Sequence, residues 1–254
     1  MNETIELIHK HGSVRSYKPD PVPPDLLEAI VVAGQRASTS SNMQMWSAIV
    51  VQDETKRHAL AKLCGDQKHI YQAPVFIAWV ADLSRLNRVA QHQGYEQRAD
   101  YTENFLLAAV DAAIAMQNGS LAAESLGLGF CYIGAIRNHP QEVIDLLELP
   151  PLTFPISGMT LGYPTEPPRI RPRLSPDAIL HWERYNPDDE AHLRAYDKEM
   201  IATGIYRGRQ VAVERNGEMV EIDYGWMEHS ARRNTTPKRP HLRDVLEKQG
   251  FLLK

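Results

Sequence analysis

The sequence predicts an α+β fold, in which helices and strands are mixed without a regular repeat. Segments typical of strands and of helices alternate along the 254 residues in an irregular order, unlike the strict alternation of a βαβ array. The most distinctive stretch is 102–129, where apolar residues fall on every side of the expected helix. Such a helix has to be covered on all sides, in a large core or between subunits. A chain of this length can form a sizeable core.

Capping residues and apolar periodicity define the elements expected in the first two thirds of the chain. Pro24 and Asp25 are placed to start a helix, and Gly127 with Leu128 is typical of a Schellman stop after the central helix. The stretch 38–47 is too polar and turn-prone for a core element, so we expect a loop there. Besides the central one, helices are expected at 4–9, 26–37, 54–64, 83–97 and 141–147. Strands are expected at 48–52, 73–80, 130–133 and 156–161.

The composition changes after residue 163. Residues 164–176 contain five prolines and three arginines, which is typical of a loop or a crossover. Beyond this loop we expect a polar helix at 188–206, the remnant of a hairpin at 217–223 and a short final helix at 242–249.

Charge and composition exclude several classes of protein. The formal net charge of −4 gives no basic field for nucleic acid. Cys64 and Cys131 are too few for a disulfide framework and lack metal-site spacing, and the pair His9 and His11 has no third ligand. The acids in MNETIELIHKHG do not fit a signal peptide, and the longest apolar run, which Asp111 interrupts, is too short to span a bilayer. We therefore expect a soluble cytoplasmic protein without a bound metal, nucleic acid or membrane.

The motifs of common catalytic sites are absent from the sequence. Gly127-Leu128-Gly129 begins a GxGxxG pattern, but Tyr132 takes the place of the third glycine, and the pattern follows a helix where a dinucleotide-binding turn would open one. The sequence contains no GxxxxGK[ST], HExxH or GxSxG motif, and no spacing of serine, histidine and aspartate singles out a triad. If the chain is an enzyme, a cofactor is expected to perform the chemistry.

Three polar stretches are candidates for binding such a cofactor. His11 to Arg15 groups a serine with two potentially cationic side chains, which suits a phosphate or an electron-rich ring edge. The serine-rich stretch 38–47 offers hydroxyls and amides to the edge of a flat heterocycle beside Trp46, and the stiff loop 169–173 presents three arginines to a phosphate. Taken alone, the first stretch is more typical of a solvated surface turn, the second is a weak signal because serine-rich loops are common, and the third could be an exposed basic loop.

Together these stretches resemble the nitroreductase family of flavoproteins, and most of all its oxygen-insensitive, NADPH-dependent nitroreductase and flavin reductase branch. The resemblance covers residues 2 to about 210, in order and nearly without gaps, which makes it more specific than any single motif. The matching segments are His11-Gly12-Ser13-Val14-Arg15, Ser40-Ser41-Asn42-Met43-Gln44-Met45-Trp46, Gly65-Asp66-Gln67-Lys68-His69, 123–129 with Tyr132-Ile133-Gly134, and Leu161-Gly162-Tyr163-Pro164 with Arg171-Pro172-Arg173-Leu174.

The resemblance implies a bound FMN and the residues that hold it. The implied FMN-binding residues are His11, Ser13, Arg15, Ser40, Gln67, Tyr132, Ile133, Gly134, Arg171 and Arg173. Among them, His11 and the two late arginines would hold the phosphate, Arg15 would face the N1/O2 edge of the flavin, and Gln67 would hydrogen-bond the ring. The sequence departs from the branch where Gly12 replaces an arginine, Met45 replaces a proline and Arg171 replaces a lysine. The last change keeps the charge.

The family fold implied by the resemblance is a sandwich of a mostly antiparallel sheet with flanking helices. It is assembled as an intertwined homodimer around the long central helix, with FMN at the seam, which agrees with a helix that is apolar on all sides. Residues 1–163 would form the FMN-binding core. Residues 164–254 would add the Pro/Arg loop, a coenzyme-binding excursion and a C-terminal extension packed on the same domain.

The implied activity is a ping-pong transfer of two electrons from NADPH to nitroaromatics, quinones or free flavin, without an obligatory side-chain acid or base. Arg207 and Arg209 are candidates for binding the 2′-phosphate of NADPH, and the family match favours Arg207. The alternative is a basic helix end that touches nothing. Two other functions remain open: a flavin reductase that supplies reduced FMN to a partner, and a non-catalytic FMN-binding protein.

Overall fold

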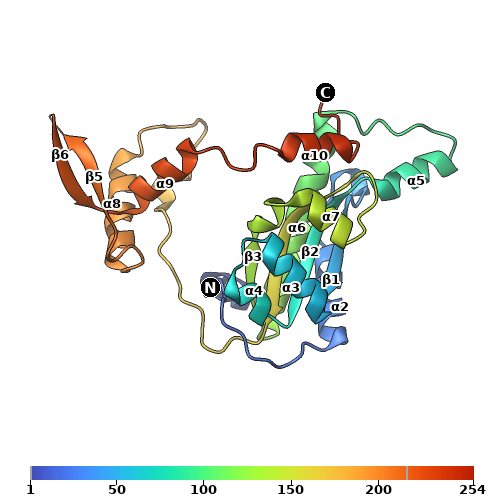
Figure 1. The fold of residues 1–254 in the computed structure, drawn as a ribbon, viewed down its shortest axis with the longest axis horizontal. Coiled ribbons are helices and arrows are strands. Elements are labelled where there is room, and N and C mark those ends of the chain that lie inside the picture. Colours follow the sequence, from blue (N-terminus) through green and yellow to red (C-terminus); the bar gives the residue numbers. More distant parts are fainter. Residues whose placement is uncertain (1, 216) are drawn as a thin grey trace. The chain divides into compact units, whose positions relative to one another are not determined.

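The computed structural model describes residues 2–215 and 217–254, and it divides into two compact units (Figure 1). The first unit contains the chain up to Arg169 together with Arg239–Lys254, and the second unit is Ile170–Lys238. The C-terminal segment therefore returns to the first unit.

The first unit is built on a four-stranded, fully antiparallel sheet with the strand order β1-β2-β4-β3. Its strands are β1 (Trp46–Val51), β2 (Val75–Asp82), β3 (Gly129–Ile133) and β4 (Thr153–Gly162). Its helices are α1 (Glu3–His9), α2 (Pro24–Gln35), α3 (Glu54–Leu63), α4 (Lys68–Gln72), α5 (Ser84–His92), α6 (Thr102–Ser125), α7 (Pro140–Leu146) and α10 (Leu242–Lys248). The predicted α+β class and the antiparallel sheet with flanking helices are confirmed.

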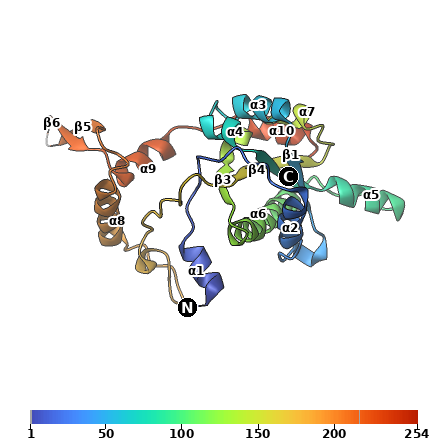
Figure 2. The same ribbon diagram turned by 90° about the horizontal axis from the view of Figure 1, so that it is seen from below.

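Helices cover both faces of this sheet, as the view in Figure 2 shows. The long helix α6 and α2 lie on one face, and α3, α4 and α7 lie on the other. The central strand β2 serves both layers, because all eight of its residues are buried and its side chains alternate between the faces. Val75, Ile77 and Trp79 pack under α2 and α6, whereas Phe76 and Val80 face the opposite layer.

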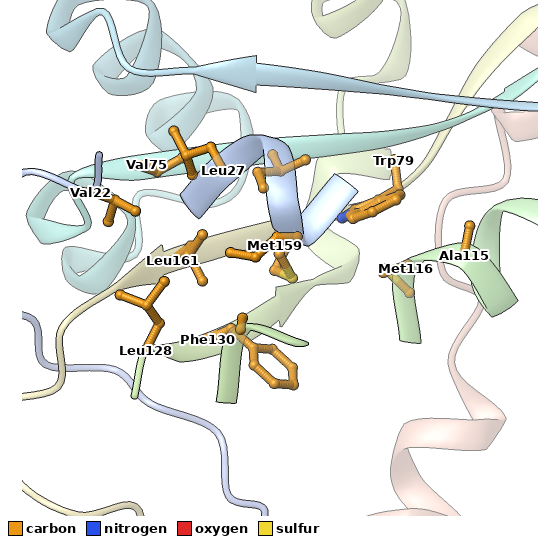
Figure 3. Packing of buried hydrophobic residues seen from close by; sticks show 13 residues of the cluster. Val22, Leu27, Val75, Trp79, Ala115, Met116, Leu128, Phe130, Met159 and Leu161 are labelled. Atoms are coloured by element: carbon orange, nitrogen blue, oxygen red, sulfur yellow. The ribbon is translucent and has the colours of Figure 1, made fainter. Parts of the chain in front are cut away.

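Two glycines allow α2 and α6 to close over the ring of Trp79, which is fully buried (Figure 3). A Cβ on Gly34 of α2 would lie 3.0 Å from the carbonyl oxygen of Ala115 on α6. A Cβ on Gly119 of α6 would lie 3.1 Å from both the carbonyl oxygen of Ile30 and the Trp79 ring. Larger residues at either place would push the helices off the sheet.

The central helix α6 ends as its sequence predicts. The amide of Leu128 donates to the carbonyl of Ala123, the amide of Gly127 donates to the carbonyl of Glu124, and Gly127 has a φ of 76°. These two bonds define a Schellman motif. By length and composition α6 is also the one helix in the described part of the chain that could cross a membrane, but it packs on α2 and β2 as a core helix does.

The second unit contains helices α8 (Glu190–Ala202) and α9 (Trp226–Thr235) and a two-stranded hairpin of β5 (Gln210–Arg215) and β6 (Glu218–Asp223). The sequence indicated only the second half of this hairpin and did not indicate α9. It also placed the end of α5 at residue 97, whereas the helix stops at His92 because Gly94 takes a φ of 78°.

Candidate functional site

The segment that follows α1 lies along the edge strand β3, and this places three of the predicted FMN-binding residues beside it. The amide of Val14 donates to the carbonyl of Phe130 at 2.8 Å, and the buried Val14 side chain packs on Gly129. Because Val14 points into the protein, its neighbours Ser13 and Arg15 point outward and are exposed. The segment thus runs along the edge of β3 and presents Ser13 and Arg15 at the surface there.

His11 is fixed at this surface by a carboxylate and an aromatic ring. Its Nδ1 lies 2.6 Å from Oε1 of Glu124 on α6, and its ring stacks on Phe130 with centroids 5.1 Å apart. The second oxygen of Glu124, Oε2, is buried and has no hydrogen-bond partner within the described chain. The pairing to Glu124 occupies Nδ1, so Nε2 is the nitrogen of His11 that remains for a ligand.

Arg15 and Ser13 lie close to two further side chains, Cys131 on β3 and His69 on α4. Burial raises the pKa of the Cys131 thiol, and nearby Arg15 and Ser13 partly oppose this. Burial, and then the charge of Arg15, lower the pKa of His69. His69 is only 8% exposed, and its Nε2 is buried without a hydrogen-bond partner among the described residues.

These groups fit the electron-rich edge of a flavin. Arg15 forms no ion pair within the described part of the chain, so its positive charge is available to a ligand. The unpartnered nitrogen of His69 beside it is a polar atom that a bound ring could satisfy. An unpaired cation next to an orphaned buried nitrogen is a reason to expect a ligand here.

The other predicted residues in this region have side chains that are bonded within the chain, buried or absent. The hydroxyl of Tyr132 donates to Oε1 of Gln117 at 2.9 Å and lies 2.7 Å from the Ser120 hydroxyl, so it points toward α6. Ile133 is buried in the sheet, and Gly134 begins a short 3-10 turn directly after it. Gln67 donates its side-chain amide to the carbonyl of Cys64 at 2.8 Å.

The structure explains why Gly12 stands where the branch carries an arginine. A Cβ at this position would lie 2.8 Å from the carbonyl oxygen of Arg169 and 2.9 Å from the Cβ of Pro168. The start of the Pro/Arg loop therefore crosses the N-terminal turn at a distance that only glycine permits.

Ser40 lies in a separate part of the first unit. Its amide donates to Oδ1 of Asp111 on α6 at 3.1 Å. Asp111 and Glu124 are roughly 20 Å apart along the helix axis, at 1.5 Å per residue. Within one chain, the structure therefore brings His11, Ser13 and Arg15 together with β3, and does not bring Ser40 to them.

The four remaining predicted residues belong to the second unit. Arg171 and Arg173 are exposed, and Arg173 donates to the carbonyls of Arg171 and Pro172 within the same loop. Arg207 and Arg209 line a cavity of about 350 Å³ together with Tyr206 and Tyr224. The guanidinium of Arg209 sits over the Tyr224 ring, 6.0 Å from its centroid, whereas Arg207 is free of such a contact.

Three residues that contact these predicted site residues or their loops, namely His69, Asp111 and Glu124, were not among the residues predicted from the sequence. The sequence contained a signal for each of them. Asp111 and Glu124 are acids in an otherwise apolar helix, and an acid there needs partners, because a buried charge without them is costly. His69 ends a matched motif, but nothing in the sequence places it next to Arg15.

Comparisons with known proteins identify the family of the chain. The model of the nitroreductase family matches residues 8–69 and 63–163, and the model of the nitroreductase family C-terminal domain matches residues 171–254. The chain is 39% identical to "FMN reductase [NAD(P)H]" of Bacillus subtilis over 99% of this chain and 98% of that one. It is 36% identical to the oxygen-insensitive NADPH nitroreductase of Salmonella typhimurium over 99% of both chains.

Solved structures agree as well. NfrA2 of B. megaterium superposes with a TM-score of 0.92 at 37% identity, covering 100% of both chains. The NADPH:FMN oxidoreductase of Vibrio harveyi, in complex with NAD+, superposes with a TM-score of 0.87 at 32% identity, again over 100% of both chains. These matches confirm the resemblance identified from the motifs at His11, Ser40, Gly65 and Ala123. The chain therefore belongs to the nitroreductase family.

Proposed function

We propose that this chain is an FMN-dependent oxidoreductase that moves two electrons from NADPH to nitroaromatics, quinones or free flavin by a ping-pong mechanism. Relatives named as NADPH nitroreductase and FMN reductase, which match nearly the whole chain, support the reaction class. The observation that carries the flavin assignment is Arg15 beside the buried, unpartnered Nε2 of His69.

Each predicted residue has a role in this proposal. Bound FMN supplies the two-electron chemistry, and the chain orients it and places charge around it. His11 presents Nε2 to the phosphate, together with Arg171 and Arg173, and Arg15 stabilises negative charge at the N1/O2 edge of the ring. The remaining FMN-binding positions, which hydrogen-bond or border the ring, are Ser13, Ser40, Gln67, Tyr132, Ile133 and Gly134.

The second unit carries the preference for NADPH. Two arginines and two tyrosines around one cavity suit the adenosine end of a coenzyme, since arginine pairs with a phosphate and an aromatic ring stacks on a base. Arg207 has the freer side chain and is proposed to bind the 2′-phosphate, with Arg209 beside it on Tyr224. This unit, with the loop before it and the segment after it, is the coenzyme-binding part. Residues 1–163 are the FMN-binding core.

We propose that the functional form is a homodimer. Leu106, Val110 and Ile114 lie four residues apart on α6 and are 54%, 45% and 39% exposed, which forms an uncovered apolar stripe along the helix that packs the core. The separation of Ser40 from His11 in one chain supports the same assembly, because a second copy could bring its Ser40 loop to the first chain's flavin. The protein is proposed to be cytoplasmic, with small-molecule acceptors and without nucleic-acid or membrane partners.

Purification tests this proposal. We expect a yellow protein with one FMN per subunit and a mass in solution of about twice the 28.7 kDa of the chain. A colourless protein that does not take up added FMN would refute the flavin assignment. Turnover with a nitroaromatic compared with turnover with free FMN then separates the main proposal from a flavin reductase that serves a partner.

A further inference from the structure

The loop that carries Ser40 is held in an unusual backbone conformation. Three of its residues that are not glycine have a left-handed φ: Ser41 at 48°, Asn42 at 57° and Gln44 at 53°. Residues with a side chain adopt this region at an energetic cost and rarely cluster in it. Three within four positions persist only if surrounding contacts impose the conformation.

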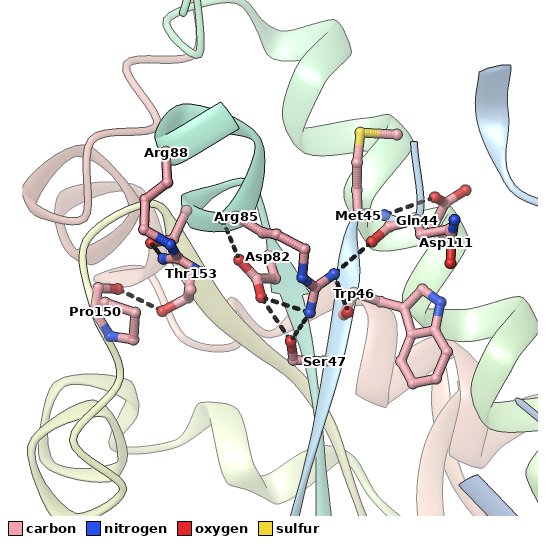
Figure 4. A network of polar contacts seen from close by, with 11 residues as sticks. Gln44, Met45, Trp46, Ser47, Asp82, Arg85, Arg88, Asp111, Pro150 and Thr153 are labelled. Carbon is pink, nitrogen blue, oxygen red and sulfur yellow. Dashed lines mark hydrogen bonds and ion pairs between the residues drawn. The ribbon is translucent and has the colours of Figure 1, made fainter. Parts of the chain in front are cut away.

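A single side chain, that of Asp111, supplies contacts at both ends of this loop. Its Oδ1 accepts from the amide of Ser40 at 3.1 Å, and its Oδ2 accepts from the amide of Met45 at 3.1 Å and from the Thr39 hydroxyl. Figure 4 shows the bond to Met45. Asp111 is 3% exposed and lies in the central helix, so the loop is tied to the long helix that packs the core.

The chemistry of these contacts requires a carboxylate. All three partners are donors, and an ionised carboxylate offers only acceptors. An asparagine would keep one acceptor oxygen and would turn its own N–H donors toward the other partners. The Thr39 hydroxyl extends the arrangement, because it also accepts from the amide of Gln44 at 2.8 Å. The carboxylate thus bonds the two residues that flank the strained segment, Ser40 and Met45, and reaches Gln44 within it through the Thr39 hydroxyl.

We propose that Asp111 is a positioning residue for the flavin site: it holds the 39–45 loop in its strained conformation and thereby fixes where Ser40 meets FMN. This inference rests on the proposed FMN binding. A buried acid in an apolar helix costs solvation free energy, and packing alone would not require it at this place. The strained loop explains the role of the acid. Without Asp111 the loop relaxes to another conformation, and part of the free energy of FMN binding is then spent on restoring the strained one.

The matched variants are Asp111→Asn and Asp82→Asn. Asp82 is also a buried acid, 7% exposed, and it accepts from the Ser47 hydroxyl at 2.6 Å and from the amide of Arg85 at 3.2 Å. Its side chain reaches the 39–45 loop only through the Arg85 guanidinium, which pairs with it at 3.4 Å and donates to the carbonyl of Gln44 at 2.9 Å (Figure 4). We expect Asp111→Asn to weaken FMN binding by roughly tenfold or more, the loss of one to two charge-assisted hydrogen bonds. Asp82→Asn should change it by less than about threefold.

Hydrogen exchange on the FMN-free proteins measures the positioning itself. The amides of Ser40 and Met45 should exchange roughly tenfold faster in Asp111→Asn than in the wild type, and at an unchanged rate in Asp82→Asn. This readout does not depend on flavin, so it keeps its meaning if the wild type fails to bind FMN. That failure would refute the proposed function and leave the loop positioning measurable.

A strain-relieving substitution separates positioning from ordinary stability. Ser41→Gly places a residue without a Cβ at a φ of 48°. In the Asp111→Asn background it should recover at least half of the lost FMN binding on a logarithmic scale, whereas in the wild type it should have little effect. Thr39→Val, which removes one of the three donors, should give an intermediate loss and serves if Asp111→Asn does not fold.

Three results would overturn the proposal. One is FMN affinity and amide exchange in Asp111→Asn within twofold of the wild type. Another is equal loss of affinity in Asp111→Asn and Asp82→Asn. The third is a double variant, Asp111→Asn with Ser41→Gly, that binds FMN no better than Asp111→Asn alone, because then the loop conformation is not what the acid maintains.

Discussion

The two units of the chain differ in how far their large aromatic side chains are buried. In the first unit the central strand is buried on both faces, and Trp79, Phe76 and Phe154 are at most 2% exposed. In the second unit Trp182 is 77% exposed, and Tyr185 is 73% exposed. The first unit thus has a core of large buried aromatic side chains, whereas the second leaves two of its large aromatic side chains exposed to solvent. In the proposed function, the first unit orients the flavin ring through Arg15, and the second unit selects the coenzyme through Arg207.

The largest expected effect contrasts the two tryptophans. Trp79→Ala removes a fully buried ring between Gly34 and Gly119 and should lower the free energy of unfolding by about 3–5 kcal/mol. Trp182→Ala removes an exposed ring and should change it by about 0.5 kcal/mol or less. Urea unfolding of the isolated variants measures both. Similar losses would mean that the second unit has a core of its own around Trp182.

Removal of Arg171 or Arg173 should weaken FMN binding by roughly 1.5–3 kcal/mol, the contribution of a charge-assisted hydrogen bond to a phosphate. Titration of the FMN-free protein with FMN, followed by flavin fluorescence, gives the dissociation constants. Arg184→Ala, a neighbouring exposed arginine of the same unit, is the control. Unchanged affinity in both Arg171→Ala and Arg173→Ala would show that the phosphate is bound elsewhere.

Arg207→Ala should raise the KM for NADPH by roughly tenfold, equivalent to about 1.4 kcal/mol, and leave the kinetics with NADH nearly unchanged. NADH lacks the 2′-phosphate, so removal of the Arg207 side chain takes away no contact with that coenzyme. Added salt should also weaken the NADPH preference of the wild type. Arg209→Ala tests the neighbour that lies on Tyr224. If Arg207→Ala impairs both coenzymes equally, the arginine serves folding or general attraction.

Arg15→Ala should make bound FMN harder to reduce. A cation at the N1/O2 edge stabilises the anionic reduced ring more than the neutral oxidised ring, so its removal should lower the two-electron potential by roughly 30 mV, or about 1.4 kcal/mol. Redox titration of the bound flavin provides the value, with Lys18→Ala as a control at an exposed cation nearby. An unchanged potential in Arg15→Ala would assign this arginine to another role.

The smallest effect concerns the pH dependence of stability. Burial and Arg15 lower the pKa of His69 in the folded protein, whereas in the unfolded chain it is about 6.5. As the pH falls through this value the unfolded state binds a proton that the folded state does not, so stability decreases. His69→Gln should therefore lose less stability than the wild type between pH 7 and pH 5. If the free energies of unfolding of His69→Gln and of the wild type fall in parallel with pH, His69 has the same pKa in the folded and the unfolded protein.

The sequence was informative where local rules determine structure. The Schellman stop at Gly127 and Leu128 and the positions of the four strands along the first unit follow from caps and periodicity, and the structure confirms them to within a few residues. The family was recognisable because several short motifs occur in one order, and the family models match these regions.

The missed features depend on contacts between distant residues. The pairing of His11 with Glu124 spans 113 positions, and the loop from Thr39 to Met45 meets Asp111 only in the folded chain. The left-handed conformations of Ser41, Asn42 and Gln44 go against local preference, so no sequence rule predicts them. Gly12 was a departure from the branch without an explanation until the backbone at Arg169 was seen to cross it.

Anaerobic mixing of the purified, FMN-loaded protein with NADPH tests the proposed function most directly. We expect the visible flavin absorbance to bleach at roughly 1 per second or faster, a normal enzymatic rate, and a nitroaromatic or quinone added afterwards to restore it. The two half-reactions then occur separately, as a ping-pong mechanism requires. Bound flavin that NADPH does not bleach would contradict the account and indicate a protein that holds FMN without using it.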